Sequence, residues 1–134
     1  MMARAHFVSL LAERATAVYR RLVGAGGEEL AIRYLPNVAA STPDAASLAR
    51  AFTAKLQAAA PSEAARRVAL TGPHRDDLGF SLDAKSINLF GSQGQRRSAV
   101  LAVKIAEYGV LRERSGEAPL LLLDDVLSEL DAQR

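Results

Sequence analysis

Leu120-Leu121-Leu122-Leu123-Asp124-Asp125 is the stretch of this chain that says most about its fold. A strand with one side in solvent would alternate apolar and polar residues, and four consecutive leucines do not. The run therefore predicts a strand covered on both faces, as in a parallel α/β sheet, although periodicity alone does not exclude a buried helix. Two carboxylates after such a strand would lie at the carboxyl edge of the sheet, where open α/β sheets bind ligands. Because neighbouring carboxylates repel each other, we expect either a bound cation or a raised pKa to relieve the repulsion, and Mg²⁺ with nucleotide phosphates is the natural candidate for the cation.

Gly91-Ser92-Gln93-Gly94-Gln95 is a second informative stretch, because a long helical pattern follows it. A serine and a glycine at the start of a helix leave several backbone N–H groups without acceptors, at the positive end of the helix dipole. Such an end binds anions, phosphate among them. Taken alone, the stretch is equally typical of an ordinary helix cap. The stripe expected to be buried on this helix is Leu101, Ile105, Tyr108 and Leu111, with Ala99, Ala102 and Ala106 allowing close packing.

Two further stretches complete the pattern, namely Thr71-Gly72-Pro73-His74-Arg75-Asp76-Asp77-Leu78 and Ser128-Glu129-Leu130-Asp131. With four motifs in this order and spacing, the chain resembles the RecF family of ABC/SMC-like ATPases, most strongly over residues 70–134. The leucine run with its two aspartates resembles the Walker B strand of that family. Ser92-Gln93-Gly94-Gln95 resembles its signature motif, and residues 128–131 resemble the D-loop that follows Walker B.

Within the signature motif, the resemblance implies that all four residues bind ATP. ABC-type ATPases bring this loop to the γ-phosphate of an ATP molecule held by the opposite subunit. Ser92 would donate its hydroxyl, Gly94 would let the backbone approach, and Gln95 would steady the loop. Gln93 stands where the usual Ser-Gly-Gly-Gln motif has its first glycine, a change that itself points to RecF.

The acidic residues of the last motifs take catalytic roles by the same resemblance. Asp124 would hold Mg²⁺ through water, as Walker B carboxylates do. Asp125 stands where most ABC ATPases have a glutamate that polarises the attacking water, and its shorter side chain predicts slow turnover. Asp131 would lie at the dimer interface and couple the two nucleotide sites. From the residues alone, the alternative is two aspartates that cap the helix after the strand.

For the whole chain, the resemblance implies an α/β fold: the C-terminal part of an ABC/SMC-like P-loop ATPase head, with a helical arm segment at its N-terminus. Residues 1–67 would form the end of the helical arm (lobe II) and a connecting strand–helix region, and residues 68–134 the ATPase-head portion. The implied function lies in DNA repair, recombination and replication and in the SOS response, in the cytoplasm. A homodimer formed with ATP would bind single-stranded and gapped duplex DNA and aid recombinase loading with RecO and RecR.

One part of an ATP site is missing from the sequence, the phosphate-binding loop Gly-x-x-x-x-Gly-Lys-Ser/Thr. None of the three lysines, Lys55, Lys85 and Lys104, follows a glycine. We therefore expect a C-terminal-side fragment of a longer protein, which hydrolyses ATP only in the full-length dimer. Leu120–Leu123 would then lack neighbouring strands and expose apolar surface. The alternative is a non-catalytic, truncated head that acts only in dimerisation or partner binding.

Composition limits these interpretations. The 134 residues contain no cysteine, which excludes disulfides and thiolate chemistry and suits the cytoplasm. No apolar run approaches the ~20 residues of a membrane span, and charged residues interrupt the N-terminus, so neither a membrane segment nor a signal peptide is predicted. Residues 1–67 carry nine Lys/Arg against five Asp/Glu, and residues 68–134 carry eight against ten. A basic half would suit DNA binding, but an arginine-rich solvated surface explains the excess equally well.

Periodicity predicts the elements of the first half. Residues 3–23 are expected to form an amphipathic helix and residues 28–36 a strand. A second helix is expected after Thr42-Pro43-Asp44, with the threonine as its cap and Pro61 as its end. The predicted apolar stripe of the first helix is Phe7, Leu11, Ala15, Val18 and Leu22.

Thr71–Leu78 predicts a loop because a Gly-Pro pair lies near its start. By their chemistry, His74, Asp76 and Asp77 would suit a metal site, although their spacing fits a loop better than one face of a helix. The favoured interpretation is a structural role, with Arg75 paired to a carboxylate. A hairpin-like pair is predicted next, with a strand at 80–82, a turn at 83–86 and an apolar stretch at 87–90.

Overall fold

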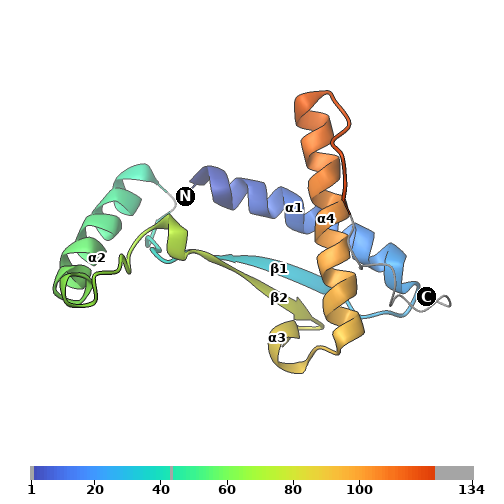
Figure 1. The fold of residues 1–134 in the computed structure, drawn as a ribbon, viewed down its shortest axis with the longest axis horizontal. Coiled ribbons are helices and arrows are strands. Elements are labelled where there is room, and N and C mark those ends of the chain that lie inside the picture. The colour runs from blue at the N-terminus through green and yellow to red at the C-terminus, as the bar shows by residue number, and fades with distance from the viewer. Residues whose placement is uncertain (1, 43, 123–134) are drawn as a thin grey trace. The chain divides into compact units, whose positions relative to one another are not determined.

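The computed structural model describes residues 2–42 and 44–122, which contain both helices and strands (Figure 1). In chain order the elements are α1 (Met2–Val23), β1 (Leu30–Leu35), α2 (Ala45–Arg66), the 3₁₀ helix η1 (Pro73–Arg75), β2 (Asp77–Leu82), β3 (Lys85–Ser86), α3 (Ile87–Phe90) and α4 (Gln93–Ser115). The strands form one sheet in the order β1-β2-β3, and β2 and β3 are antiparallel. Among the described residues, none of the helices has the length and apolarity needed to cross a membrane.

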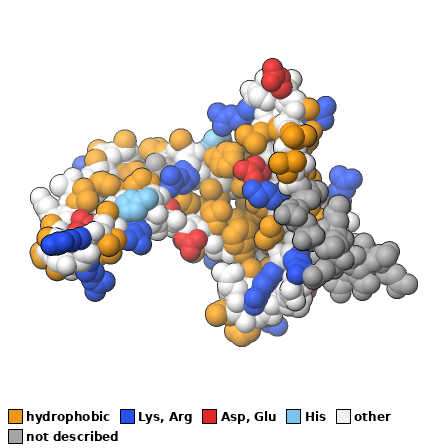
Figure 2. Space-filling model, in the orientation of Figure 1, with side chains coloured by type: hydrophobic (Ala, Val, Ile, Leu, Met, Phe, Trp, Pro, Cys, Tyr) orange, Lys and Arg blue, Asp and Glu red, His pale blue; other side chains and the backbone are white. Residues whose placement is uncertain are grey.

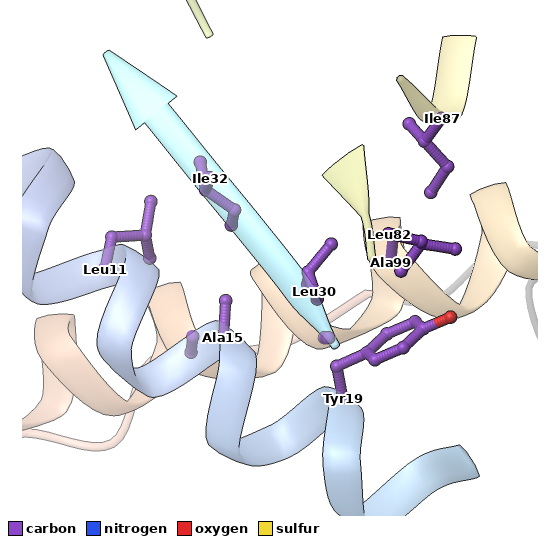
Figure 3. Close-up of a cluster of buried hydrophobic side chains, with 10 residues drawn as sticks. Leu11, Ala15, Tyr19, Leu30, Ile32, Leu82, Ile87 and Ala99 are labelled. Carbon is purple, nitrogen blue, oxygen red and sulfur yellow. The ribbon is translucent and has the colours of Figure 1, made fainter. Parts of the chain in front are cut away.

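The chain divides into two compact units. The first contains the residues up to Ala5 together with Tyr34–Leu78, and the second contains His6–Arg33 and the chain from Gly79 onward. Side chains of α1, β1, β2, α3 and α4 form the core of the second unit (Figure 3). Its buried members are Leu11, Ala15, Tyr19, Leu30, Ile32, Leu82, Ile87, Ala99, Ala102 and Ala106. Full burial of a Leu- or Ile-sized side chain contributes about 1.5–3 kcal/mol, so this layer holds the five elements together.

Helix α1 forms where the sequence predicts it. Its buried residues are Val8, Leu11, Ala15 and Tyr19. Leu11 and Ala15 belong to the predicted stripe, whose other members are only partly buried, whereas Val8 and Tyr19 are buried without belonging to it. The helix ends at Gly24, which has a φ of 77° and donates its N–H to Arg20 O at 3.1 Å.

Helix α2 begins later than the sequence suggests. Asp44, not Thr42, is its N-cap, and a carboxylate oxygen of Asp44 accepts a hydrogen bond from the Ser47 backbone N–H at 2.8 Å. Thr42 supports this cap by donating its hydroxyl to the same carboxylate. The bonds from Thr42 and Ser47 lower the pKa of Asp44 from 3.8 to about 2.

The prediction that Pro61 ends this helix is wrong, because α2 continues to Arg66. A proline inside a helix lacks an N–H donor and crowds the preceding turn, at a cost of about 3 kcal/mol. The alanine-rich residues on both sides of Pro61 have high helix propensity and offset that cost. Arg67 then closes the helix in the left-handed conformation, with a φ of 53°.

Strands β2 and β3 form the predicted hairpin with shifted boundaries. Its turn is Asp83-Ala84, and both residues have positive φ (44° and 64°), as a type I′ turn requires. Because the turn needs only two residues, the second strand is Lys85–Ser86. The apolar stretch Ile87–Phe90 is therefore not a strand but the single helical turn α3, closed by a bond from Gly91 N–H to Ile87 O at 2.9 Å.

Helix α4 buries its small side chains. The buried residues are Ala99, Leu101, Ala102, Ala106 and Val110. The prediction for Leu111 is wrong, since this residue is 46% exposed and Val110 faces the core in its place. Near the end of the helix, both terminal nitrogens of Arg14 donate to the Glu113 carboxylate at 2.7 and 2.6 Å, which joins α1 to α4.

The leucine run is described only as far as Leu122. Leu120 and Leu122 are 86% and 83% exposed, and these residues have no regular secondary structure. The expected exposure of apolar surface is confirmed for this part of the run. A strand covered on both faces is not formed by residues 120–122, because no strand in the described ranges pairs with them.

Candidate functional site

A reciprocal pair of hydrogen bonds fixes the start of α4. Ser92 is the N-cap, with an extended backbone (φ −65°, ψ 163°), and its Oγ accepts from the Gln95 backbone N–H at 3.2 Å. In return, Gln95 Oε1 accepts from the Ser92 backbone N–H at 2.6 Å. This arrangement is a capping box, which satisfies two groups that a helix start leaves unpaired. Gln95, itself part of the loop, therefore fixes the loop backbone at Ser92.

Two side chains tie this loop to its surroundings in the second unit. Gln95 Nε2 donates to Glu28 Oε1 at 2.6 Å. Arg96 donates through Nε to Ile87 O at 3.2 Å and through Nη2 to Asn88 O at 3.1 Å. The sequence leaves open whether Arg96 meets phosphate, DNA or solvent, and the structure shows that it holds α3 against the start of α4.

The glycines of the loop differ in what surrounds them. A Cβ on Gly91 would lie 2.5 Å from Ile87 O, so the chain itself requires glycine there. A Cβ on Gly94 would meet nothing within 4 Å. Glycine inside a helix costs about 1 kcal/mol relative to alanine. Because no described residue uses the space beside Gly94, this position suits the close approach of a group from outside the chain.

The exposed side of the loop has the chemistry of an anion site. The N–H groups of Gln93 and Gly94 lie in the first turn, where a helix provides no acceptors. The dipole of the 23-residue helix α4 places partial positive charge at the same end. Ser92 Oγ accepts its bond from Gln95, which leaves the hydroxyl proton available to donate. The Glu28 carboxylate is the one opposing charge bonded to the loop in the described part of the chain.

The remaining predicted site residues lie outside the described residues. Asp124, Asp125 and Asp131 belong to this group, as do Ser128–Leu130 of the D-loop motif. Their assigned roles stay predictions. The part of the site that the structure brings together is Ser92–Gln95.

The Thr71–Leu78 motif is built around a buried carboxylate in the first unit. The Asp76 side chain is 3% exposed, and its Oδ2 accepts from Arg4 Nη1 at 2.7 Å and from the Tyr34 hydroxyl. Its Oδ1 accepts from the Asn37 backbone N–H at 2.8 Å. Burial opposes ionisation and is the strongest single influence, but the bonds from Tyr34, Asn37 and Arg4 together lower the pKa of Asp76. Burial and the bond to Asp76 raise the pKa of Tyr34.

The predicted structural role of this motif agrees with these contacts, with one change of partner. Asp76 pairs with Arg4, whereas Arg75 donates through Nε to Ala69 O at 2.9 Å. Within residues 2–42 and 44–122, no three His, Asp or Glu side chains are grouped to hold a metal ion. His74, Asp76 and Asp77 therefore do not form the metal site that their chemistry allowed.

The sequence alone does not reveal the residues that hydrogen-bond to Asp76 of the Thr71–Leu78 motif or to Gln95 of the signature motif. Arg4, Tyr34 and Asn37 are 72, 42 and 39 positions from Asp76, and Glu28 is 67 positions from Gln95. Spacing rules connect residues three or four apart on a helix or two apart on a strand. No local pattern could therefore have identified these four residues.

Positive charge is spread over the face of the molecule that Figure 2 shows. On the face shown in Figure 2, Lys and Arg side chains occur singly or in small groups among apolar side chains. The small excess of basic residues in the first half of the sequence therefore does not gather into one patch on that face. A phosphate-binding interpretation depends on the loop at the start of α4 rather than on this face.

Known proteins resemble the chain over nearly its whole length. It is 46% identical to the DNA replication and repair protein RecF of Chloroflexus aurantiacus, over 93% of this chain and 34% of that protein. RecF of Geobacillus kaustophilus is 42% identical (96% and 34%), and RecF of Gloeobacter violaceus is 44% identical (92% and 34%). The chain spans about a third of the length of these relatives. No protein-family model matches it.

Solved structures agree with this relationship. The recombination mediator protein RecF with ATP, in the RecFOR pathway, superposes with a TM-score of 0.81 and 28% identity, over 98% of this chain and 35% of that one. The same protein with ATPrS gives a TM-score of 0.82 and 28% identity, over 97% and 34%. The predicted resemblance to RecF, and with it the fold class, is confirmed.

Proposed function

We propose that this chain, a homologue of about a third of RecF, is part of a DNA replication and repair protein that binds ATP between two copies of itself. The observation that carries the proposal is the Ser92–Gln95 loop, which offers a hydroxyl and free N–H groups at a helix start and open space at Gly94. The ATP and ATPrS named with the two RecF structures support a nucleotide phosphate as the anion.

The loop acts by donating hydrogen bonds. Ser92 donates its hydroxyl to the γ-phosphate of ATP held by the opposite copy, and the N–H groups of Gln93 and Gly94 donate to the phosphate oxygens. Charge-assisted bonds of this kind are shorter and stronger than neutral ones. Gln95 keeps the loop in shape through its bond to the Ser92 N–H. Because the phosphate comes from the other copy, this contact forms only when two copies dimerise.

Hydrolysis depends on the acidic residues beyond the leucine run. Bound ATP with Mg²⁺ supplies the phosphoryl group that is transferred to water. Asp124 would hold the Mg²⁺, and Asp125 would orient the water and accept its proton. Asp131 would act at the dimer interface and couple the two nucleotide sites.

A wider role is part of the proposal. We propose that the dimer binds single-stranded and gapped duplex DNA and aids recombinase loading, with proteins of the RecO and RecR type as partners. The words "replication and repair", "recombination mediator" and "RecFOR pathway" in the names of the relatives support these roles.

Substitution of Ser92 by arginine in the full-length protein tests the loop. The large charged side chain would fill the space that the γ-phosphate needs, so Ser92→Arg should abolish ATP-dependent dimerisation measured by light scattering. Ser62→Arg, at an exposed serine on α2, is the matched control and should dimerise like the wild type. ATP-dependent dimerisation of Ser92→Arg at the wild-type level would show that this loop does not contact the nucleotide.

Substitution of Asp124 by asparagine tests the hydrolytic part separately. Asparagine keeps the shape of the side chain but removes the charge that holds Mg²⁺, so ATP hydrolysis should fall while ATP binding persists. Unchanged hydrolysis by Asp124→Asn would refute the Walker B assignment. A wild-type protein that dimerises with ATP but does not hydrolyse it would favour the non-catalytic alternative.

A further inference from the structure

Glu28 contacts the signature loop from a distant part of the sequence. This residue lies two positions before β1, and its Oε1 accepts the hydrogen bond from Gln95 Nε2 at 2.6 Å. Gln95 Oε1 at the same time accepts from the Ser92 N–H at 2.6 Å. The Gln95 side chain therefore bridges the Glu28 carboxylate and the backbone of Ser92.

The carboxylate determines which way the Gln95 amide points. An amide has one end that donates and one that accepts, whereas a carboxylate accepts only. If the amide turned over, its oxygen would face the Glu28 carboxylate and its NH₂ group would face the Ser92 N–H, so that both bonds would be lost together. Glu28 thus selects the orientation in which Gln95 completes the cap of Ser92.

The backbone that carries Glu28 is itself held in place. The Glu29 N–H donates to Asp83 Oδ1 at 2.9 Å, and the Asp83 N–H donates to Glu29 O at 3.1 Å. These two bonds fasten the segment before β1 to the turn between β2 and β3. All of these residues belong to the second unit, so the support of the loop lies within one compact body.

We infer that Glu28 is a positioning residue for nucleotide binding: it orients Gln95 and thereby sets the geometry with which Ser92 meets phosphate. The inference rests on the proposed function of the Ser92–Gln95 loop. The inference also predicts the direction in which phosphate binding changes. The negative charge of Glu28 beside an anion site weakens phosphate binding, whereas the bond from Gln95 to Glu28 strengthens it. Removal of the charge and removal of the bond should therefore have opposite effects.

Two substitutions separate the bond from the charge. Glu28→Ala removes both, whereas Glu28→Gln removes the charge and keeps an oxygen that accepts from Gln95. Glu29→Ala is the matched control, because Glu29 is the adjacent carboxylate and its side chain pairs with Arg20 at 3.6 Å rather than with the loop.

The first readout is the ¹H–¹⁵N NMR spectrum of the 134-residue chain, which does not depend on nucleotide. Glu28→Ala should shift the resonances of the Ser92 amide and the Gln95 side-chain amide, while Glu28→Gln and Glu29→Ala leave the Ser92 amide near its wild-type position. Unchanged resonances in Glu28→Ala would overturn the inference. An equal shift in Glu28→Ala and Glu28→Gln would do the same.

The second readout is ATP-dependent dimerisation of the full-length protein. Glu28→Ala and Glu28→Gln both lack the charge, so Glu28→Ala should dimerise about two- to tenfold more weakly than Glu28→Gln, the range expected for one lost hydrogen bond. Glu28→Gln should dimerise at least as tightly as the wild type, and Glu29→Ala equally to it. Equal dimerisation of Glu28→Ala and Glu28→Gln would overturn the inference. Failure of the wild type to dimerise would instead refute the proposed function, and the NMR comparison would still decide how Gln95 is oriented.

Discussion

Asp76 belongs to the Thr71–Leu78 motif, and its carboxylate contributes to the fold. Its two oxygens accept hydrogen bonds from Arg4, Tyr34 and Asn37, which come from the first turn of α1, from β1 and from the segment after β1. The Asp76 carboxylate is almost fully buried, so it depends on these three bonds to compensate for its lost contact with water. A run of ionisable residues in a sequence can therefore mark a structural junction as readily as a catalytic site.

Asp76→Ala should destabilise the chain by about 2–3 kcal/mol, because it leaves the Tyr34 hydroxyl and the Asn37 N–H, both partly buried, without their acceptor. Urea unfolding monitored by circular dichroism at pH 7 measures the change. Asp77→Ala is the control, since this neighbour is exposed and its side chain bonds only to the adjacent Leu78 N–H in the described contacts. Equal stability of the two variants would show that the Asp76 network contributes nothing.

The stability provided by Asp76 should disappear in acid. Its pKa in the folded chain lies below the ordinary value of 3.8, so the ionised group stabilises the fold above pH 3.8, and that stabilisation is lost as the pH falls through the folded-state pKa. Asp76→Asn cannot take up a proton there. The difference in unfolding free energy between wild type and Asp76→Asn should therefore shrink between pH 5 and pH 2, whereas a constant difference would contradict the assignment.

Gly94→Ala should separate stability from function. Nothing lies within 4 Å of the added methyl group, so α4 should gain about 1 kcal/mol from the higher helix propensity of alanine. The same methyl group would stand where phosphate is proposed to approach. Thermal unfolding should therefore show a higher Tm while ATP-dependent dimerisation weakens. A stabilised variant that dimerises normally would argue against close contact at this position.

At the scale of elements, α2 and α4 show how far local patterns determine structure. Both helices begin with a side-chain cap that short-range chemistry explains, Asp44 in α2 and Ser92 in α4. The two helices differ in how much of their surface is buried. α4 packs its alanine face into the core of the second unit, whereas α2 has no buried residue. The stability of α2 must therefore come mainly from helix propensity and its cap.

Pro61→Ala tests the continuous form of α2. If the helix runs through residue 61, alanine restores a backbone donor and removes the clash of the proline ring, and the helix should gain about 1–3 kcal/mol. Circular dichroism at 222 nm and urea unfolding measure this gain. If the helix ended at Pro61, as the sequence alone suggests, the substitution would leave the helical signal nearly unchanged.

The sequence predicts the type of most elements and the start of α4 correctly. The signature loop is found from its own residues, because a cap and a helix start are local events at Ser92 and Gln95. The partners Glu28 and Arg4 are not found, since tertiary folding brings them there across 67 and 72 positions. The stretch 87–90 is mispredicted for a related reason: its apolar residues suit a strand, but the two-residue turn at Asp83-Ala84 leaves them beyond the hairpin.

Two features of the whole chain concern the parts of an ATP site that it does not contain. It spans about a third of the length of its RecF relatives and has no Gly-x-x-x-x-Gly-Lys-Ser/Thr loop. Leu120 and Leu122 present apolar side chains to solvent in the described part of the chain. Both observations fit the proposal that the chain contains only part of an ATP site.

The 134-residue chain should not bind ATP tightly by itself, because the main cradle for the β- and γ-phosphates is missing. Mixed with a separately produced N-terminal segment of a RecF relative that contains this cradle, it should bind ATP. Isothermal titration calorimetry of each component and of the mixture measures both. Tight binding by the chain alone would refute the view that its residues form only part of the site.

The pairing of Arg14 with Glu113 also bears on how the protein is synthesised. The two residues are 99 positions apart, and a ribosome adds about 5–20 residues per second. Helix α1 therefore emerges about 5–20 s before the end of α4 exists. Through that interval its apolar side, with Leu11 and Tyr19, has no cover from α4. The contact between α1 and α4 therefore forms late in synthesis, once translation has passed Glu113.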